Sequence, residues 1–166
     1  MAELRPRQFL HLYLGTDHAG FVLKEDIKAW LQTEGFVVDD CGAYELQDDD
    51  DFPDFILPVA EAVAAAVRMG EMTVAAIIFG GSGQGEAIAA NHIPHVRAAV
   101  YYGGDATIVP LSRAHNNANV LSLGARFVAA DDAKAVIWEW LHTPALTDPK
   151  YNRRNEKIDK VTGNLN

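Results

Sequence analysis

The chain has 166 residues, of which 49% are hydrophobic. This length and composition favour one globular domain with a sizeable core and exclude long disorder. Fourteen lysines and arginines against 23 aspartates and glutamates give a formal charge of -9, which opposes nonspecific binding to nucleic acid or to an anionic membrane surface. No apolar run approaches the length of a membrane span, and the first residues, MAELRPRQFLHLYLG, lack the long apolar core of a secretory leader. We therefore expect a cytoplasmic protein.

Apolar patterns and turn residues divide the chain into alternating strands and helices. We expect strands at 9–14, 36–40, 73–79, 97–102 and 120–123. We expect helices at 19–31, 55–69, 105–115 and 130–141, with a short one that ends near residue 91. This order predicts an α/β fold in which helices cover both faces of a five-stranded parallel sheet.

The last part of the chain is polar but has helical spacing. We expect a single domain over 1–166, with a core at about 9–145 and a C-terminal helix at about 150–162. An isolated polar helix of this length is marginal in water and needs a surface to pack on. A partner subunit is the natural candidate.

Residues 77–92, IIFGGSGQGEAIAANH, read as a buried strand, a glycine-rich loop and the start of a helix. Glycines let the backbone approach a ligand closely, and successive loop N–H groups can converge on an oxyanion. Glu86 falls on the first helical turn, where the positive end of the helix dipole favours an ionised carboxylate. A base beside an oxyanion cradle suits proton abstraction next to a carbonyl. The alternative is a common strand-to-helix turn in which Glu86 is only a good helix-start residue.

Two other segments carry polar side chains with more than one interpretation. Asp17 and His18 follow the first strand, where Asp17 could cap a helix or serve a substrate. His115 and Asn116 lie in the segment SRAHNNAN, which reads as a capped helix end or as a site in which His115 moves a proton and Asn116 orients hydroxyls. In a parallel sheet, we expect 15–20, 80–86 and 124–126 to converge at the carboxyl ends of the strands.

Metal chemistry finds little support in the sequence. The six histidines are scattered without cysteine partners, so we expect no metal site. The single cysteine, Cys41, is read as a small buried apolar residue. The run of aspartates at 48–51 is read as a solvated loop.

Three blocks of the chain together resemble the type B ribose-5-phosphate isomerases, a family that also contains allose-6-phosphate and galactose-6-phosphate isomerases. The blocks are GTDHAGFVLK at 15–24, GGSGQGEAIAAN at 80–91 and SRAHNNANVLSLGAR at 112–126. They stand in the family's order, and the resemblance extends weakly from about 9 to 159. It implies a Rossmann-like subunit, a sugar-phosphate ligand without metal or nucleotide cofactor, and a homodimer or dimer of dimers with sites at its interface.

The resemblance also implies roles by position. His115 resembles the histidine that opens the sugar ring, assisted by Asp17. The positions that resemble the cradle for the enediolate oxygen are Ser82, Gly81, Gly83 and Gly85. The other positions that resemble substrate ligands, several of them for the phosphate, are His18, Asn116, Arg113, Arg126, Arg153 and Lys157.

The chain departs from the family pattern at three positions. Many members carry a catalytic cysteine where this chain has Gly80, whereas a second branch uses a glutamate at the position of Glu86, and GGSGQGE resembles that branch. Phe52 stands where members often place an aromatic hydroxyl before a proline. Lys157 replaces a common arginine, which keeps the charge but loses the two-pronged contact with phosphate.

We therefore expect an aldose–ketose isomerase that interconverts ribose 5-phosphate and ribulose 5-phosphate through a cis-enediol, with Glu86 as the base. One alternative is an isomerase of a six-carbon sugar phosphate. Another is a sensor that binds sugar phosphate without catalysis. A flavodoxin-like or dinucleotide-binding module is disfavoured, because the glycine loop follows the third strand rather than the first.

Overall fold

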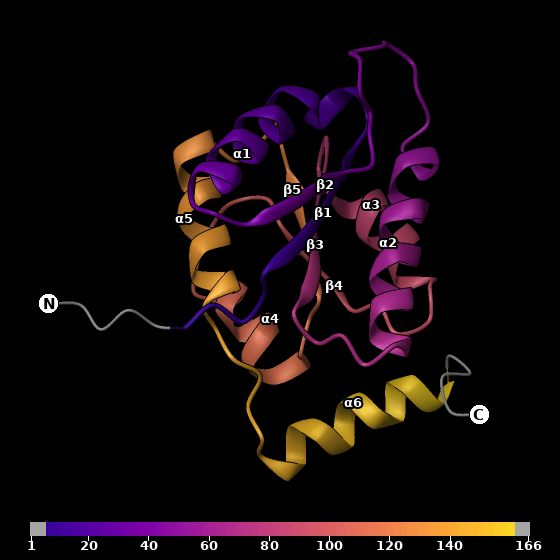
Figure 1. Ribbon diagram of the computed structural model, residues 1–166, viewed down its shortest axis with the longest axis vertical. Helices are drawn as coiled ribbons and strands as arrows, with labels where there is room; N and C mark the ends of the chain where they lie inside the picture. The colour runs from indigo at the N-terminus through magenta and orange to yellow at the C-terminus, as the bar shows by residue number, and fades with distance from the viewer. Residues whose placement is uncertain (1–5, 162–166) are drawn as a thin grey trace, which may run out of the picture.

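A computed structural model describes residues 6–161; the expected domain 1–166 and the end of the expected helix 150–162 extend beyond them. Its sheet has five parallel strands in the order β2-β1-β3-β5-β4, with helices on both faces (Figure 1). This confirms the predicted three-layer α/β fold. The strands are β1 (His11–Thr16), β2 (Val37–Asp40), β3 (Val74–Gly80), β4 (Ala98–Tyr101) and β5 (Val120–Gly124).

Helices α1, α4 and α5 cover one face of the sheet, α2 and α3 cover the other, and α6 lies below α4 at the amino ends of the strands (Figure 1). Within residues 6–161, no helix combines the length and apolar character needed to cross a membrane. The helices are α1 (Phe21–Thr33), α2 (Pro53–Arg68), α3 (Gln84–Asn91), α4 (Ile108–Asn116), α5 (Ala130–Leu141) and α6 (Pro149–Val161), with a short 3-10 turn, η1 (His18–Gly20), before α1.

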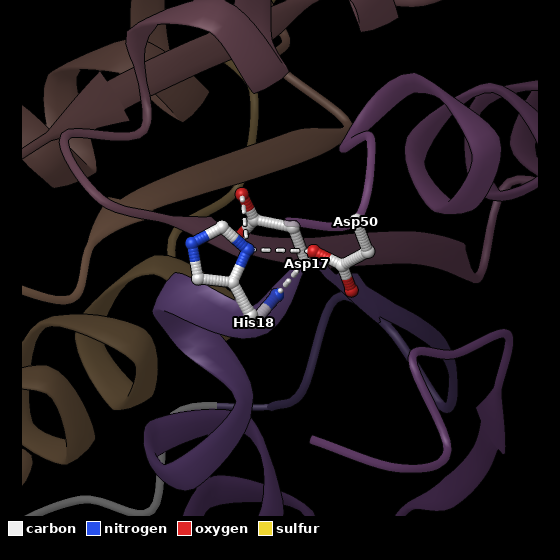
Figure 2. Close-up of side chains that lie close together, drawn as sticks. All are labelled: Asp17, His18 and Asp50. Carbon is white, nitrogen blue, oxygen red and sulfur yellow. Dashed lines mark hydrogen bonds and ion pairs between the residues drawn. The ribbon is translucent and has the colours of Figure 1, made fainter. Parts of the chain in front are cut away.

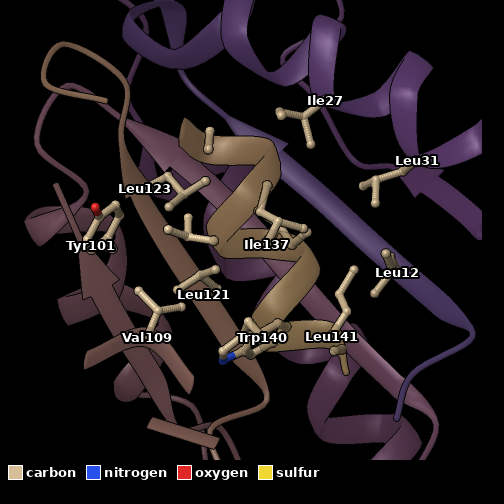
Figure 3. Packing of buried hydrophobic residues seen from close by; sticks show 14 of the residues in the cluster. Leu12, Ile27, Leu31, Tyr101, Val109, Leu121, Leu123, Ile137, Trp140 and Leu141 are labelled. Carbon is tan, nitrogen blue, oxygen red and sulfur yellow. The ribbon is translucent and has the colours of Figure 1, made fainter. Parts of the chain in front are cut away.

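The core lies on both sides of β3, whose seven residues are all buried. Ile77 and Phe79 face the layer of α1 and α5. Trp140 is fully buried in that layer (Figure 3). It stacks on Phe9 at 5.3 Å between ring centroids. Ile78 faces α2 on the other side. Because each such side chain contributes about 1.5 to 3 kcal/mol on burial, this central strand fixes where its last residue and the following loop lie.

Helix α2 begins two residues earlier than expected, at Pro53. Proline is favoured at the first helical position because the N–H that it lacks would have no partner inside the helix. The loop between β2 and α2, residues 41–52, contains the aspartate run and is called the acidic loop below. It therefore ends at Phe52 rather than at Asp54. This places the Phe52 side chain beside the glycine loop, since a Cβ on Gly85 would lie 3.1 Å from Phe52 Cζ.

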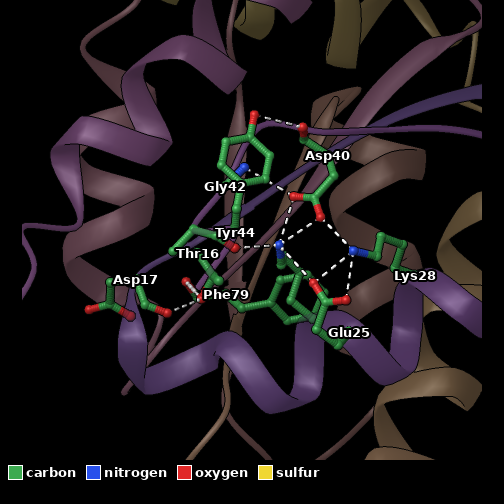
Figure 4. Close-up of polar contacts among 10 residues, drawn as sticks. Thr16, Asp17, Glu25, Lys28, Asp40, Gly42, Tyr44 and Phe79 are labelled. Atoms are coloured by element: carbon green, nitrogen blue, oxygen red, sulfur yellow. Dashed lines mark hydrogen bonds and ion pairs between the residues drawn. The ribbon is translucent and has the colours of Figure 1, made fainter. Parts of the chain in front are cut away.

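A cluster of ion pairs around the buried Lys24 holds the beginning of the acidic loop, where it leaves β2 (Figure 4). Lys24 has no exposed surface, and its Nζ donates to Asp40 Oδ1 at 2.7 Å and to the carbonyl of Ala43 at 2.8 Å. Lys28 Nζ donates to Asp40 Oδ2 at 2.6 Å. Burial alone would raise the pKa of Asp40, but the hydrogen bonds from both lysines outweigh it and the pKa is lowered. The cluster joins α1 to the chain that follows β2.

We predict that Lys24→Met lowers the free energy of unfolding by about 3 kcal/mol, because it leaves the half-buried Asp40 with only one of its two cationic partners. Urea unfolding measures this change. Lys134→Met is the matched control, since Lys134 pairs with Asp26 near the surface and its loss should cost less than about 1 kcal/mol. Equal losses in the two variants would contradict the prediction.

Candidate active site

The loops that follow β1, β3 and β5 meet at one edge of the sheet. Thr16 pairs with Phe79 across β1 and β3, and Gly80 pairs with Gly124 across β3 and β5. The backbone N–H of Arg126 donates to the carbonyl of Gly81 at 3.2 Å. The predicted convergence of 15–20, 80–86 and 124–126 is confirmed.

Glu86 is buried at this edge, with only 5% of its surface exposed. A Cβ built on Gly80 would overlap the Glu86 carboxylate, so the carboxylate lies directly against the bare Cα of Gly80. Burial raises the pKa of Glu86, the negative charge of Asp17 adds to the rise, and a hydrogen bond from its own backbone N–H opposes it. The expected stabilisation of the ionised form by the helix start is therefore outweighed. A carboxylate with a raised pKa is a stronger base.

The glycine loop is held in place by its neighbours. Gly83 takes a left-handed conformation (φ 77°) at the start of α3, and its carbonyl accepts a hydrogen bond from Ser122 Oγ at 2.6 Å. Ser82 Oγ accepts a hydrogen bond from the N–H of Gln84 at 3.4 Å. A Cβ on Gly81 would lie 3.3 Å from Arg126 Cζ, so the guanidinium lies beside the loop. The predicted cradle and one predicted phosphate ligand are adjacent.

Asp17 and His18 stand next to an acidic residue from a distant loop (Figure 2). Asp17 Oδ1 accepts from the N–H of Ala19 at 3.0 Å, so the expected alternative of helix capping is observed. Asp50 Oδ1 contacts His18 Nδ1 at 2.6 Å and accepts from the His18 N–H at 2.9 Å. The hydrogen bond to Asp50 raises the pKa of His18, the charge of Asp17 adds to this, and burial and Arg126 oppose it.

Sequence reasoning missed Asp50. The aspartate run at 48–51 was interpreted as a solvated loop, which holds for its other three members but is wrong for Asp50, whose side chain is only 11% exposed. Nothing in a row of four identical residues marks the one that turns inward. The signal that the sequence does offer is Pro53, which marks the end of the loop and the start of the next helix.

The atoms of Asp17, His18 and Asp50 that could bind a metal all lie within 4.8 Å of one another. A carboxylate can only accept hydrogen bonds, so the short contact with Asp50 requires a proton on Nδ1 of His18 and leaves that nitrogen no lone pair for a cation. The arrangement is that of a hydrogen-bonded cluster. The absence of a functional metal stays a prediction.

The remaining predicted residues lie at the opposite edge of the sheet. His115 and Asn116 end α4, shortly before Val120, the first residue of β5. Glu86 lies at the other end of the strands, because it follows Gly80, which pairs with Gly124, the last residue of β5. Four residue steps of strand, about 13 Å, separate the two ends of β5. The ring of His115 stacks on Tyr151 of α6 at 4.3 Å, and Arg153 and Lys157 are exposed on α6. One copy of the chain does not bring this group to Glu86.

Arg113 is a correction to the predicted phosphate ligands. Its side chain is 5% exposed, lies over the ring of Phe9 at 4.5 Å, and donates to the carbonyl of Ala118 and to Asn117 Oδ1. Burial, with a smaller effect of Arg97, lowers its pKa to about 10. Arg113 therefore holds the turn between α4 and β5. Asn117, at φ 48°, caps α4 as the helix-end interpretation predicted.

Comparison with known proteins identifies this arrangement. The α/β subunit, with its carboxylate and glycine loop at the carboxyl edge, is similar in fold to solved sugar-phosphate isomerases, and the profile of the Ribose/Galactose Isomerase family matches residues 12–161. The chain belongs to this family.

Two relatives and one solved structure illustrate the similarity. Ribose-5-phosphate isomerase B of Mycolicibacterium paratuberculosis is 38% identical over 146 residues, 87% of each chain. D-erythrulose-4-phosphate isomerase 2 of Mycolicibacterium smegmatis is 37% identical over 134 residues, 80% of this chain and 84% of that one. The crystal structure of ribose-5-phosphate isomerase B from Mycoplasma genitalium with bound ribulose-5-phosphate aligns with a TM-score of 0.83 at 31% identity, covering 92% of this chain and 96% of the other.

The contact between Gly80 and Glu86 makes a prediction about stability. Gly80→Ala should lower the free energy of unfolding by about 1 to 3 kcal/mol, because the methyl group must displace a buried carboxylate. In a Glu86→Ala background the same change should cost much less, since the obstacle is gone. Gly81→Ala is the control, because its neighbour is the exposed and flexible Arg126. Chemical denaturation of the wild-type protein, Gly80→Ala, Glu86→Ala and the double variant measures the coupling, and additive losses would contradict the contact.

Proposed function

We propose that the protein interconverts ribose 5-phosphate and ribulose 5-phosphate through a cis-enediol, with Glu86 as the base. The observation that carries the proposal is the buried Glu86 carboxylate at the end of the central strand, with its pKa raised and the glycine loop around it. Chemistry of this kind needs neither a metal nor a nucleotide cofactor. We also propose that the protein works in the cytoplasm.

In the proposed reaction, Glu86 takes the proton from C2 of the open-chain aldose. The C–H electron pair becomes the C1–C2 double bond, and the carbonyl π pair moves onto the C1 oxygen. The C1 oxygen then takes up the proton that O2 gives up, the O2 electron pair forms the C2=O bond, and the C1–C2 π pair takes the proton back from Glu86 at C1, which gives the ketose. One carboxylate suffices because the two carbons are adjacent. Ser82 and the loop amides are the proposed donors to the developing oxyanion, where one donor is typically worth about 3 to 4 kcal/mol.

We propose that a second copy of the chain completes the site. The partner copy would supply His115 to open the sugar ring with Asp17, and Asn116 to orient hydroxyls. Two observations support this. His115 is separated from Glu86 within one chain, and α6 presents exposed apolar Ile158 and Val161 beside its cations, as a helix that packs on a partner would.

The phosphate would then lie between cations from both copies. Arg126 beside Gly81 is the proposed ligand from one copy. Arg153 and Lys157 are four residues apart on α6 and so share one face of that helix, from which the other copy would reach the phosphate. Anchoring the phosphate positions the carbon skeleton for proton transfer.

A four-carbon and a six-carbon sugar phosphate are the two alternatives to the pentose, and each has an observation in its support. One relative acts, by its name, on a four-carbon sugar phosphate, and the family includes galactose in its description. The Phe52 ring packs against Gly85 where a hydroxyl is common in the family, which changes the polarity of that wall. We favour the pentose because the other relatives described above carry that name. A noncatalytic sensor is disfavoured, since a sensor has no use for a buried base.

We predict that Glu86→Gln nearly abolishes isomerisation while sugar-phosphate binding persists, because the amide keeps the shape but cannot accept the C2 proton. The measurement follows ribose 5-phosphate in deuterated water by NMR, where the wild-type protein should form ribulose 5-phosphate with deuterium at C1 or C2. Erythrose 4-phosphate, allose 6-phosphate and galactose 6-phosphate are tried in parallel to settle sugar length.

The control for this variant is Glu61→Gln, an exposed glutamate on α2 whose loss should leave turnover unchanged. Substantial turnover by Glu86→Gln would remove Glu86 from the role of base. Turnover only of a four- or six-carbon sugar would keep the mechanism and change the substrate. No turnover of any sugar would favour the sensor.

A second prediction tests the two-copy site. Glu86→Gln and His115→Ala subunits should each be inactive alone but regain activity when co-refolded, since each mixed dimer contains one site with both residues intact. Random pairing in a twofold dimer should restore about a quarter of the wild-type activity.

The comparison for this experiment is the pair of pools refolded separately and then assayed together without exchange of subunits. A mixture that stays as inactive as these pools would show that Glu86 and His115 act within one copy or not at all.

A further inference from the structure

Asp50 differs from its neighbours in the acidic loop. Asp48, Asp49 and Asp51 are exposed, whereas the Asp50 side chain is 11% exposed. Its Oδ1 accepts from the backbone N–H of His18 at 2.9 Å and from Nδ1 of the same residue at 2.6 Å (Figure 2). One oxygen thus holds the main chain and the ring of His18 together. A ring tied to its own backbone in this way has a fixed orientation.

This contact also decides the chemistry of the other ring nitrogen. Because the carboxylate only accepts, the proton of a neutral His18 is on Nδ1 and Nε2 carries the lone pair. A protonated His18 has an N–H at Nε2. In both states Nε2 is the nitrogen left for a ligand, and it points away from Asp50 (Figure 2).

The charged groups around His18 come from three separate loops. Asp17 Oδ2 lies 3.9 Å from Nδ1, Asp50 lies at 2.6 Å, and Arg126 is near enough to influence the titration of the ring. Two of these, Asp17 and Arg126, belong to the edge that holds Glu86. His18 therefore stands between the acidic loop and the proposed substrate site.

Only one of the two carboxylate oxygens of Asp50 is used in these contacts. Its Oδ2 is buried and has no hydrogen-bond partner among the residues that the structure describes. A buried carboxylate oxygen without a partner is costly, so the contacts of Oδ1 with His18 are made at the expense of loop stability. Two residues further on, Phe52 packs against Gly85 at the start of α3. The Asp50 contact thus fastens the loop next to the site at the point where the loop meets it.

We propose that Asp50 is a positioning residue of the active site, which fixes the ring of His18 so that Nε2 is presented to the sugar phosphate. This inference rests on the proposed isomerase function. It assigns a role to a loop aspartate that touches no substrate and acts only through His18.

A double-mutant cycle tests the proposal. Asp50→Ala should lower kcat/KM for ribose 5-phosphate about tenfold, by analogy with the loss of residues that orient a ligand-binding histidine. In a His18→Ala background, the same change should cost less than about twofold, because the ring that Asp50 holds is already gone. A merely structural role would give equal losses in both backgrounds, and that result would overturn the proposal.

Two further variants keep the test sound. Asp50→Asn retains an acceptor oxygen, should fold if Asp50→Ala does not, and should recover most of the lost kcat/KM; if it folds and is as impaired as Asp50→Ala, the positioning role is overturned. Asp48→Asn removes the same charge from an exposed position and should leave kcat/KM unchanged. An equal loss in Asp48→Asn would assign the effect to the charge of the loop and overturn the role of Asp50.

An NMR titration of the His18 ring separates failure of this inference from failure of the proposed function. Removal of Asp50 should lower the pKa of His18 whether or not the protein turns over a sugar phosphate. An unmoved titration would overturn the pairing itself. An inactive wild-type protein with a shifted titration would instead refute the isomerase function, and with it the catalytic part of this inference, while the pairing stands.

Discussion

The position of one buried carboxylate constrains the rest of the site. Glu86 lies against the bare Cα of Gly80, at the last residue of a strand buried on both faces. A side chain at position 80 and the Glu86 carboxylate cannot occupy this space together. The family resemblance implies two branches, one with a cysteine at this strand end and one with a glutamate on the following helix, and this chain resembles the second. If Glu86 is the base, as we propose, the two branches place a base at one point by alternative routes. The absence of a side chain at Gly80 is what permits the second.

The acidic loop is held at both ends by contacts of charged side chains. The buried Lys24 holds its beginning through Asp40 and Ala43, and Asp50 holds its end through His18. Buried ion pairs add little net stability when compared with apolar packing, so their use here is better explained by position than by energy. Two residues after Asp50, Phe52 packs against Gly85 at the glycine loop.

The sequence predicted the elements better than their contacts. The unbroken apolar run of β3 identified the central strand, because only a strand covered on both faces can be apolar at every position. Lys24 and Asp50 were missed because helical periodicity and a row of identical aspartates do not reveal which charge turns inward. Arg113 was misassigned because it stands two residues before His115. On a helix such residues point about 200° apart, so the side that offers His115 to a ligand turns Arg113 into the core.

The separation of the two groups of site residues follows from the topology and not from details of the loops. In a parallel sheet each helix returns the chain from the carboxyl edge to the amino edge, so residues at a strand's end and residues at a helix's end lie on opposite edges. Glu86 follows the end of β3, and His115 ends α4. No rearrangement of loops within one copy can reverse this order. In the dimer that we propose, a twofold axis would set the amino edge of one copy against the carboxyl edge of the other and unite both groups twice, because an isologous contact makes two identical sites from a single surface. The polar α6 carries its cations at the amino edge, where such a contact would need them (Figure 1).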